Sequence, residues 1–123
     1  MDAKSKRAAL ALALVEALPD GWTVYASPPE TVTAPSVVIG PRVPYREWGT
    51  FGTEDVNLQL SLLVPRALGA SALDVLDEAL DTVLEAVDSV DNAMPMATAL
   101  GLTQTSAAGV EYLTAAIDVT VKG

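Results

Sequence analysis

The sequence predicts an α+β fold, in which a mainly antiparallel sheet of four to five strands carries two helices packed on one face. Three observations predict this class: helical composition or spacing at residues 4–18 and from Ser71 onward, a long alternating run at residues 54–64, and a closing hairpin around residues 108–109. The 123 residues are taken as one domain, 1–123, because a chain of this length can bury a single core.

The first helix is predicted at residues 4–18, a segment rich in alanine and leucine, which are the best helix formers. The Pro-Asp-Gly sequence at residues 19–21 ends it. Within residues 8–18 the only polar residue is Glu16, so the helix lacks the polar face that a helix on one core usually shows. Two interpretations stay open: a core helix with an alanine-rich solvent side, or a helix whose second side is buried by another subunit.

The N-terminal segment also imitates a secretion signal, since Lys4, Lys6 and Arg7 precede an apolar run. Asp2 and Glu16 interrupt that pattern. No run reaches the roughly 18 apolar residues that a membrane span needs. We therefore expect a cytosolic origin and no membrane association.

Short strands are predicted at residues 22–26 and 37–40, the second fenced by Pro35 and Pro41, because proline cannot donate a hydrogen bond to a sheet ladder. Residues 54–64 form the clearest strand, since apolar residues at the even positions alternate with mostly polar ones. Eleven residues in a strand extend about 36 Å, which is long for a globular domain. We therefore expect part of this strand to project beyond the body of the protein.

The second helix is predicted to begin at Ser71 and to have two unlike faces. Its apolar stripe consists of Leu73, Leu76, Leu80, Val83, Leu84 and Val87. Its acidic face consists of Asp74, Asp77, Glu78, Asp81, Glu85 and Asp88. Residues 100–107 and 110–122 then form the closing hairpin. We expect the core between sheet and second helix to contain Leu58, Leu60, Leu62, Leu76, Leu80, Leu84, Ile117 and Val119.

Composition excludes several classes of function. The chain has no cysteine and no histidine, so it lacks thiolate catalysis, the commonest general base and the commonest metal ligand. Its net charge is −9 and its only basic cluster is N-terminal, which argues against sequence-specific DNA binding. The acidic helix face is expected to be solvated, with a hard-cation site as the alternative. We predict that the chain is not an enzyme and has no catalytic, cofactor-binding or metal-binding residues and no cofactor.

The segment between the second and third predicted strands is unusually rich in aromatic and basic side chains. Tyrosine, tryptophan and arginine are enriched in interface hot spots, and loops often carry function. We interpret the segment as an arm for a subunit or tail interface, with its arginines facing acidic partner surface. The alternative is a loop that caps the domain's own core. The candidate interface residues are Arg42, Tyr45, Arg46, Trp48 and Phe51.

The order of these elements resembles one protein family. The Ala/Leu helix is followed by "PSVVIGP", a tyrosine, "VNLQLSLLVP", the acidic "VLDEALDTVLEAV" and the hairpin strand "GVEYLTAAIDVTV". Together they resemble the tail terminator proteins of long-tailed, siphovirus-type bacteriophages, particularly those of actinobacterial phages. The resemblance covers nearly the whole chain in order and length and depends on arrangement, so no binding residue is carried over from it.

The resemblance implies a structural virion protein that forms a homo-oligomeric, usually hexameric, ring. Such a ring would cap the head-proximal end of the tail tube, end tail polymerisation and join the tail to the head. Its implied partners are the major tail protein and the head-side connector or stopper protein, and DNA would pass through the lumen without sequence recognition. The implied location is the tail or neck of the virion, after assembly in the host cytoplasm.

Two alternatives stay open. A neighbouring head-tail connector, stopper or tail-tube protein would share the size, the acidity and the lack of catalytic residues. A small metal-dependent enzyme using the acidic helix would belong to a different class, and a divalent ion bound at that helix would favour it.

Overall fold

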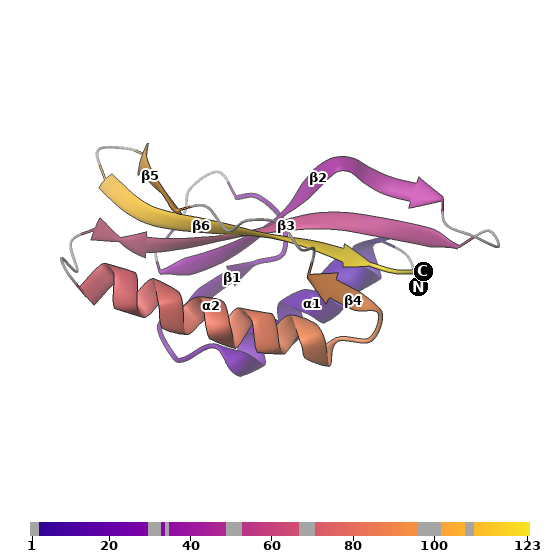
Figure 1. Ribbon diagram of the computed structural model, residues 1–123, viewed down its shortest axis with the longest axis horizontal. Coiled ribbons are helices and arrows are strands. Elements are labelled where there is room, and N and C mark those ends of the chain that lie inside the picture. Colours follow the sequence, from indigo (N-terminus) through magenta and orange to yellow (C-terminus); the bar gives the residue numbers. More distant parts are fainter. Residues whose placement is uncertain are drawn as a thin grey trace.

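A computed structural model describes residues 3–29, 33, 35–48, 53–66, 71–95, 102–107 and 110–123, with the backbone alone for residues 102–107, 110 and 111. Its elements are, in order, α1 (Ala3–Ala17), β1 (Thr23–Tyr25), β2 (Ser36–Trp48), β3 (Glu54–Pro65), α2 (Ser71–Ser89), β4 (Ala93–Pro95), β5 (Leu102–Ala107) and β6 (Val110–Val121). Both helices lie on the same side of one curved sheet, and the other side of the sheet has no helix from the described residues (Figure 1).

The described strands form a single six-stranded sheet in the order β1-β2-β3-β6-β4, with β5 alongside β6. The β1–β2 pair is parallel and every other pair is antiparallel. The predicted α+β class, the helices on one face and the closing hairpin are confirmed. Two strand predictions are wrong: β4, which is only three residues long, was not expected, and β2 continues to Trp48 instead of ending at Gly40.

The core fills the space between the sheet and the two helices. Leu58, Leu60 and Leu62 of β3 are fully buried, because alternation along the strand turns them all to the helix side. Burial on that side continues from the other elements through Leu10, Leu14, Ile39, Leu76, Val83, Val87, Ile117 and Val119. Six of the eight predicted core residues are therefore confirmed, the exceptions being Leu80 and Leu84, which are half-buried.

The buried side of α2 is rotated from the predicted stripe. Leu73, the first residue of that stripe, is 44% exposed, whereas Ala79 and Ala86 are buried. Small alanine side chains allow the helix backbone to approach its neighbours closely, and this shifts the line of closest contact away from the larger residues at 80 and 84. The predicted stripe was therefore correct at Leu76, Val83 and Val87 and wrong at its edge.

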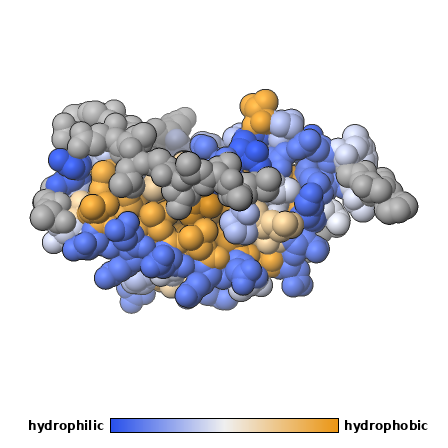
Figure 2. Space-filling view, in the orientation of Figure 1, coloured by the Kyte–Doolittle hydropathy of each residue, from blue (hydrophilic) through white to orange (hydrophobic). Residues whose placement is uncertain are grey.

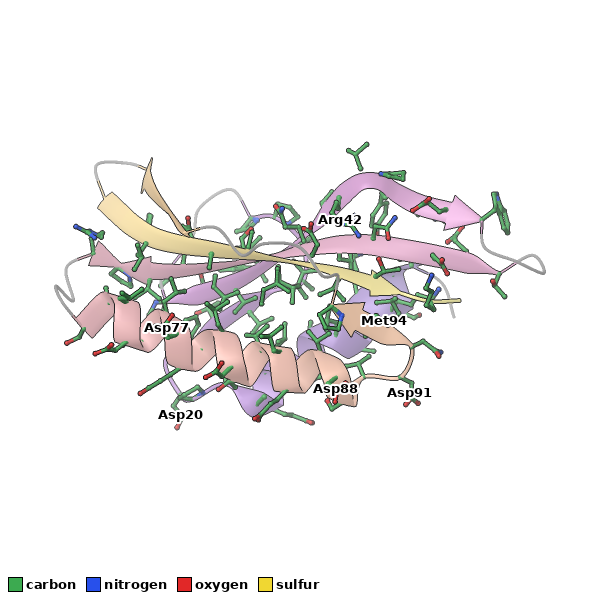
Figure 3. The ribbon with its side chains drawn as sticks, in the orientation of Figure 1. Asp20, Arg42, Asp77, Asp88, Asp91 and Met94 are labelled. Carbon is green, nitrogen blue, oxygen red and sulfur yellow. The ribbon has the colours of Figure 1, made fainter. Side chains whose placement is uncertain are left out.

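The acidic face of α2 points away from the sheet. All six of its predicted carboxylates are exposed. Figure 3 shows Asp88 on the outer side of the helix, and the same side is hydrophilic in the space-filling view (Figure 2). In the part of the chain that the structure describes, no group of three or more histidine, cysteine, aspartate or glutamate side chains could hold a metal ion. None of the helices described is long and apolar enough to cross a membrane.

From this exposed acidic face we predict how salt affects the stability of the protein. Added NaCl should raise the thermal unfolding midpoint smoothly, because salt screens the mutual repulsion of the α2 carboxylates. CaCl₂ at equal ionic strength should add nothing specific. Calorimetric titration of Ca²⁺ and Mg²⁺ into the wild type and the Asp81→Asn variant is the check. A stoichiometric isotherm that this substitution abolishes would revive the metal-dependent enzyme.

Candidate subunit interface on strand β2

Strand β2 changes its surroundings along its length. At Ser36–Val38 it lies between β1 and β3 and is paired with both. Beyond Val38 the described strands leave its outer edge unpaired, and its register with β3 shifts between Pro41 and Arg46. The Val43–Pro44 peptide bond is cis. Proline is tolerated in strands at edges and bulges, where no sheet partner needs its missing N–H. Pro41 and Pro44 therefore interrupt the outer edge of β2 without ending the strand, which corrects the prediction of a loop over this segment.

The shifted part of β2 rises away from the sheet, and a polar cluster lies beneath it. We define this polar cluster as Arg42, Glu47, Asn57, Asp118 and Thr120. Because their strand neighbours Leu58 and Val119 face the helices, Asn57 and Thr120 point to the opposite side of the sheet. Figure 3 shows Arg42 between the raised part of β2 and the rest of the sheet.

Asn57 is the centre of the polar cluster, and it is only 3% exposed. Its Nδ2 donates to the Pro44 carbonyl oxygen at 2.7 Å and to Glu47 Oε1 at 2.5 Å. Its Oδ1 accepts from Thr120 Oγ1 at 2.7 Å and from Arg42 Nη2 at 3.3 Å. An amide has two donor hydrogens and an oxygen with two lone pairs, so this side chain is fully bonded. Asn57 therefore ties the raised part of β2 to the two central strands.

Arg42 and Arg46 are both paired with carboxylates of their own chain. Arg42 Nε lies 3.9 Å from Asp118 Oδ1, and its Nη2 donates to Thr120 Oγ1 at 3.1 Å. Arg46 Nε donates to Glu54 Oε1 at 2.8 Å. We expected both arginines to meet an acidic surface on a partner. That expectation stays a prediction: the Arg42 side chain is 26% exposed and bonds within its own chain, and the Arg46 side chain is 55% exposed beside Glu54.

The aromatic residues of the segment separate into internal and external ones. Tyr45 is half-buried against the core and lines a small open pocket with Arg7, Pro28, Ile39 and Pro41. Trp48 is 79% exposed. Tyr45 thus packs on the domain's own core, as the core-capping interpretation expects, and Trp48 is exposed, as the interface interpretation expects. The interface itself stays a prediction. Phe51 lies outside the described residues.

Trp48 lies on the helix side of the sheet, at its projecting end. It is paired with Glu54, two residues before the buried Val56, which faces the helices, so alternation turns Glu54 and Trp48 to the same side. Lys6 Nζ donates to the Glu54 carbonyl oxygen at 2.7 Å, which puts the first turns of α1 beside the base of this end. The paired ends of β2 and β3 reach beyond both helices (Figure 1), which confirms the expected projection.

The C-terminal residues fix the base of the projecting end. Asp55 Oδ1 accepts a hydrogen bond from the Gly123 backbone N–H at 3.1 Å, and Asp55 Oδ2 pairs with Lys122 Nζ at 3.2 Å. The Gly123 hydrogen bond, and after it the Lys122 hydrogen bond, lower the pKa of the Asp55 carboxyl, because both stabilise its charged form. The carboxylate therefore stays ionised at neutral pH and keeps both contacts.

Two further exposed apolar features were not among the predicted site residues. Val43, next to the cis proline, is 94% exposed. The sequence predicted no strand beyond Gly40, so it gave no basis for assigning Val43 to a side of the sheet, and the register shift between Pro41 and Arg46 changes which side each residue faces. On α1, Leu12 and Val15 are 60% and 59% exposed while Leu10 and Leu14 are fully buried. The near absence of polar residues in this helix was the feature of the sequence that indicated exposed apolar side chains on it.

The described residues thus present a projecting β2–β3 end that carries an exposed tryptophan and is held at its base by hydrogen bonds and ion pairs. They also present an apolar outer side on α1. No family model matches the chain, and no curated protein matches it.

Proposed function

We propose that this chain is a structural virion protein of the tail-terminator type. Copies of it would form a ring, hexameric by resemblance, that caps the head-proximal end of a phage tail tube. The ring would end tail polymerisation and join the tail to the head-side connector or stopper. The major tail protein would be its partner on the tail side, and DNA would pass through the lumen without being read.

The observation that carries the proposal is the exposed Trp48 on a projecting strand end that hydrogen bonds and ion pairs hold in place. A tryptophan buries on the order of 150–250 Å² when it is covered, so leaving it in water sacrifices a large favourable contribution. Hydrogen bonds and ion pairs hold the strands on which it sits: Asn57 fixes β2 from beneath, and Arg46 pairs with Glu54 beside it. Such pre-ordering reduces the entropy lost on binding, which suits an assembly contact.

The chemistry of the described residues supports the same class of function. Six of the described carboxylates lie along the outer face of α2. Glu54, Asp55 and Asp118 pair with basic residues of the same chain, which are Arg46, Lys122 and Arg42. An assembly protein needs complementary surfaces and no reacting group. The sequence resemblance supplies the particular assembly, a phage tail, and the surfaces described above supply contacts by which copies could associate.

The proposal predicts the effect of Trp48→Ala. The purified wild-type protein should sediment as a ring-sized oligomer and show an open lumen by negative-stain microscopy. Trp48→Ala should weaken each contact by about 30-fold, since a central aromatic anchor commonly contributes about 2 kcal/mol. Sedimentation velocity over a concentration series measures the change.

Met94→Ala is the matched control, because Met94 is also exposed and apolar but lies on β4. It should leave the oligomer unchanged, and circular dichroism should show that both variants stay folded. A wild-type protein that remains monomeric at high concentration would refute the ring. In a second test, the wild-type ring is added to the major tail protein from the same genome while that protein polymerises. Tail tubes that grow past their normal length would refute the capping function.

A further inference from the structure

We infer that Trp48 of one copy docks on the outer stripe of α1 in the next copy, so that the contact is head-to-tail. The outer stripe of α1 is defined here as Ala8, Leu12 and Val15, which lie on one exposed or partly exposed side of the helix. The inference rests on the proposed ring and adds to it the receiving surface.

The exposed apolar side chains provide the first step. The large ones among the described residues are Leu12, Val15, Val43, Trp48, Leu73 and Met94. Leu73 and Met94 stand singly on different elements. Leu12 and Val15 are three residues apart on one helix and therefore adjacent on its surface. The described residues thus include an exposed apolar pair on α1 and, on β2, the exposed Val43 and Trp48, of which Trp48 is the larger.

Symmetry gives the second step. A two-fold contact can also set Trp48 of each copy on α1 of the other, but it joins two copies and then stops. A head-to-tail contact sets the two features against different neighbours, and its repetition closes a ring when the rotation closes. The proposed ring therefore favours the head-to-tail arrangement.

The position of Trp48 gives the third step. Trp48 faces the helix side of the sheet beyond the first turns of its own α1, where none of the described helices lies beneath the strands (Figure 1). A helix from a neighbouring copy would continue the helix layer under this projecting end. The stripe on α1 suits an indole ring, because Ala8 leaves the helix surface low beside the larger Leu12 and Val15.

The local charges favour a second copy of the chain as the partner that Trp48 contacts. A chain of net charge −9 repels its own kind unless the contact joins opposite charges locally. Arg46 lies on the same side of the sheet as Trp48 and is about half exposed. Glu16 follows Val15 on α1 and is exposed. With Trp48 on the stripe, Arg46 would approach Glu16 of the neighbour, which orients the contact.

The absence of cysteine in the chain allows a clean test by cross-linking. Ala8→Cys places one thiol on the outer stripe, and Thr53→Cys places one beside the projecting end, so that Trp48 itself is kept. The two single variants are purified separately, mixed and treated with a short bismaleimide. Each variant carries a single thiol, so every cross-link must join two chains. We expect the mixture to give several-fold more cross-linked dimer than either variant alone.

The matched control mixes Met94→Cys with Thr53→Cys, which should give only the background yield. Adding Trp48→Ala to the Thr53→Cys variant should return the yield to that background. Efficient cross-linking of Ala8→Cys alone would show α1 on α1 and overturn the head-to-tail contact. A normal oligomer by sedimentation without the 8–53 cross-link would also overturn it, while leaving the proposed function standing. A protein that never oligomerises would instead overturn the proposed function, and this contact with it.

Discussion

Replacing Leu76 with alanine should lower the free energy of unfolding by about 2–5 kcal/mol. Leu76 is fully buried on the side of α2 that faces the core. Removing its side chain loses the transfer free energy of the deleted methyl and methylene groups, and the cavity left behind adds to the loss because packed interiors relax only partly. Urea denaturation of the wild type and the variant measures the difference.

Leu73→Ala is the control for this substitution, because it removes the same groups from the same helix at a site that is 44% exposed. Its cost should stay below about 1 kcal/mol, close to that of other surface changes. Equal losses for the two variants would contradict the observed rotation of α2 and favour the stripe predicted from sequence, in which residues 73 and 76 face the core together.

The sequence could predict elements whose pattern is local. The alternation in β3 and the three- and four-residue spacing in α2 each reflect a single face on a single core. The sequence therefore identified β3 with almost the right ends and α2 with the right first residue. The rotation of α2 was harder to predict. Pattern analysis gives weight to large apolar residues such as Leu80 and Leu84, whereas the structure buries Ala79 and Ala86 and leaves those two leucines only partly buried. The identity of the neighbouring element decides which alanines are buried.

The length of strand β2 and the sides to which its residues face depend on partners that are distant in the sequence. Pro41 ends a strand only if an outer neighbour needs its N–H, and the sequence does not show that β1 stops pairing at Val38. The register shift then breaks the alternation, so Tyr45 turns toward the core and Trp48 stays exposed. Which of the described candidate residues are buried and which are exposed is therefore set by the sheet around them.

Asn57 is the clearest case of a role that the local pattern concealed. It lies in the polar row of β3, which predicted a solvent-facing side chain. The row does face away from the helices, but the raised part of β2 covers one end of it, so Gln59 is exposed and Asn57 is buried. Its bonding partners come from residues 10 to 63 positions away in the chain. The polar row correctly predicted the side of the sheet to which Asn57 points. It could not predict that the raised part of β2 covers this residue.

Asn57→Ala should therefore lower the free energy of unfolding by about 2–4 kcal/mol. This is an unusually large loss for a residue on the polar face of a strand. The substitution deletes four hydrogen bonds and leaves the Pro44 carbonyl and the Thr120 hydroxyl to find other partners in a covered site. Each buried polar group left without a partner costs about 1–3 kcal/mol, and relaxation of β2 recovers part of that loss. Urea denaturation gives the change in the free energy of unfolding.

A second measurement separates loss of the β2 attachment from general destabilisation. Backbone amides of the paired ends of β2 and β3 should exchange with solvent faster in Asn57→Ala, while amides at the buried centre of β3 change only as the global stability requires. Gln59→Ala is the control, because Gln59 is exposed in the same row and makes a single 3.4 Å contact with Asp118. It should cost less than about 1 kcal/mol. If Asn57→Ala were no more costly than this control, or if its projecting end exchanged no faster, the polar cluster would not be what holds Trp48 in position.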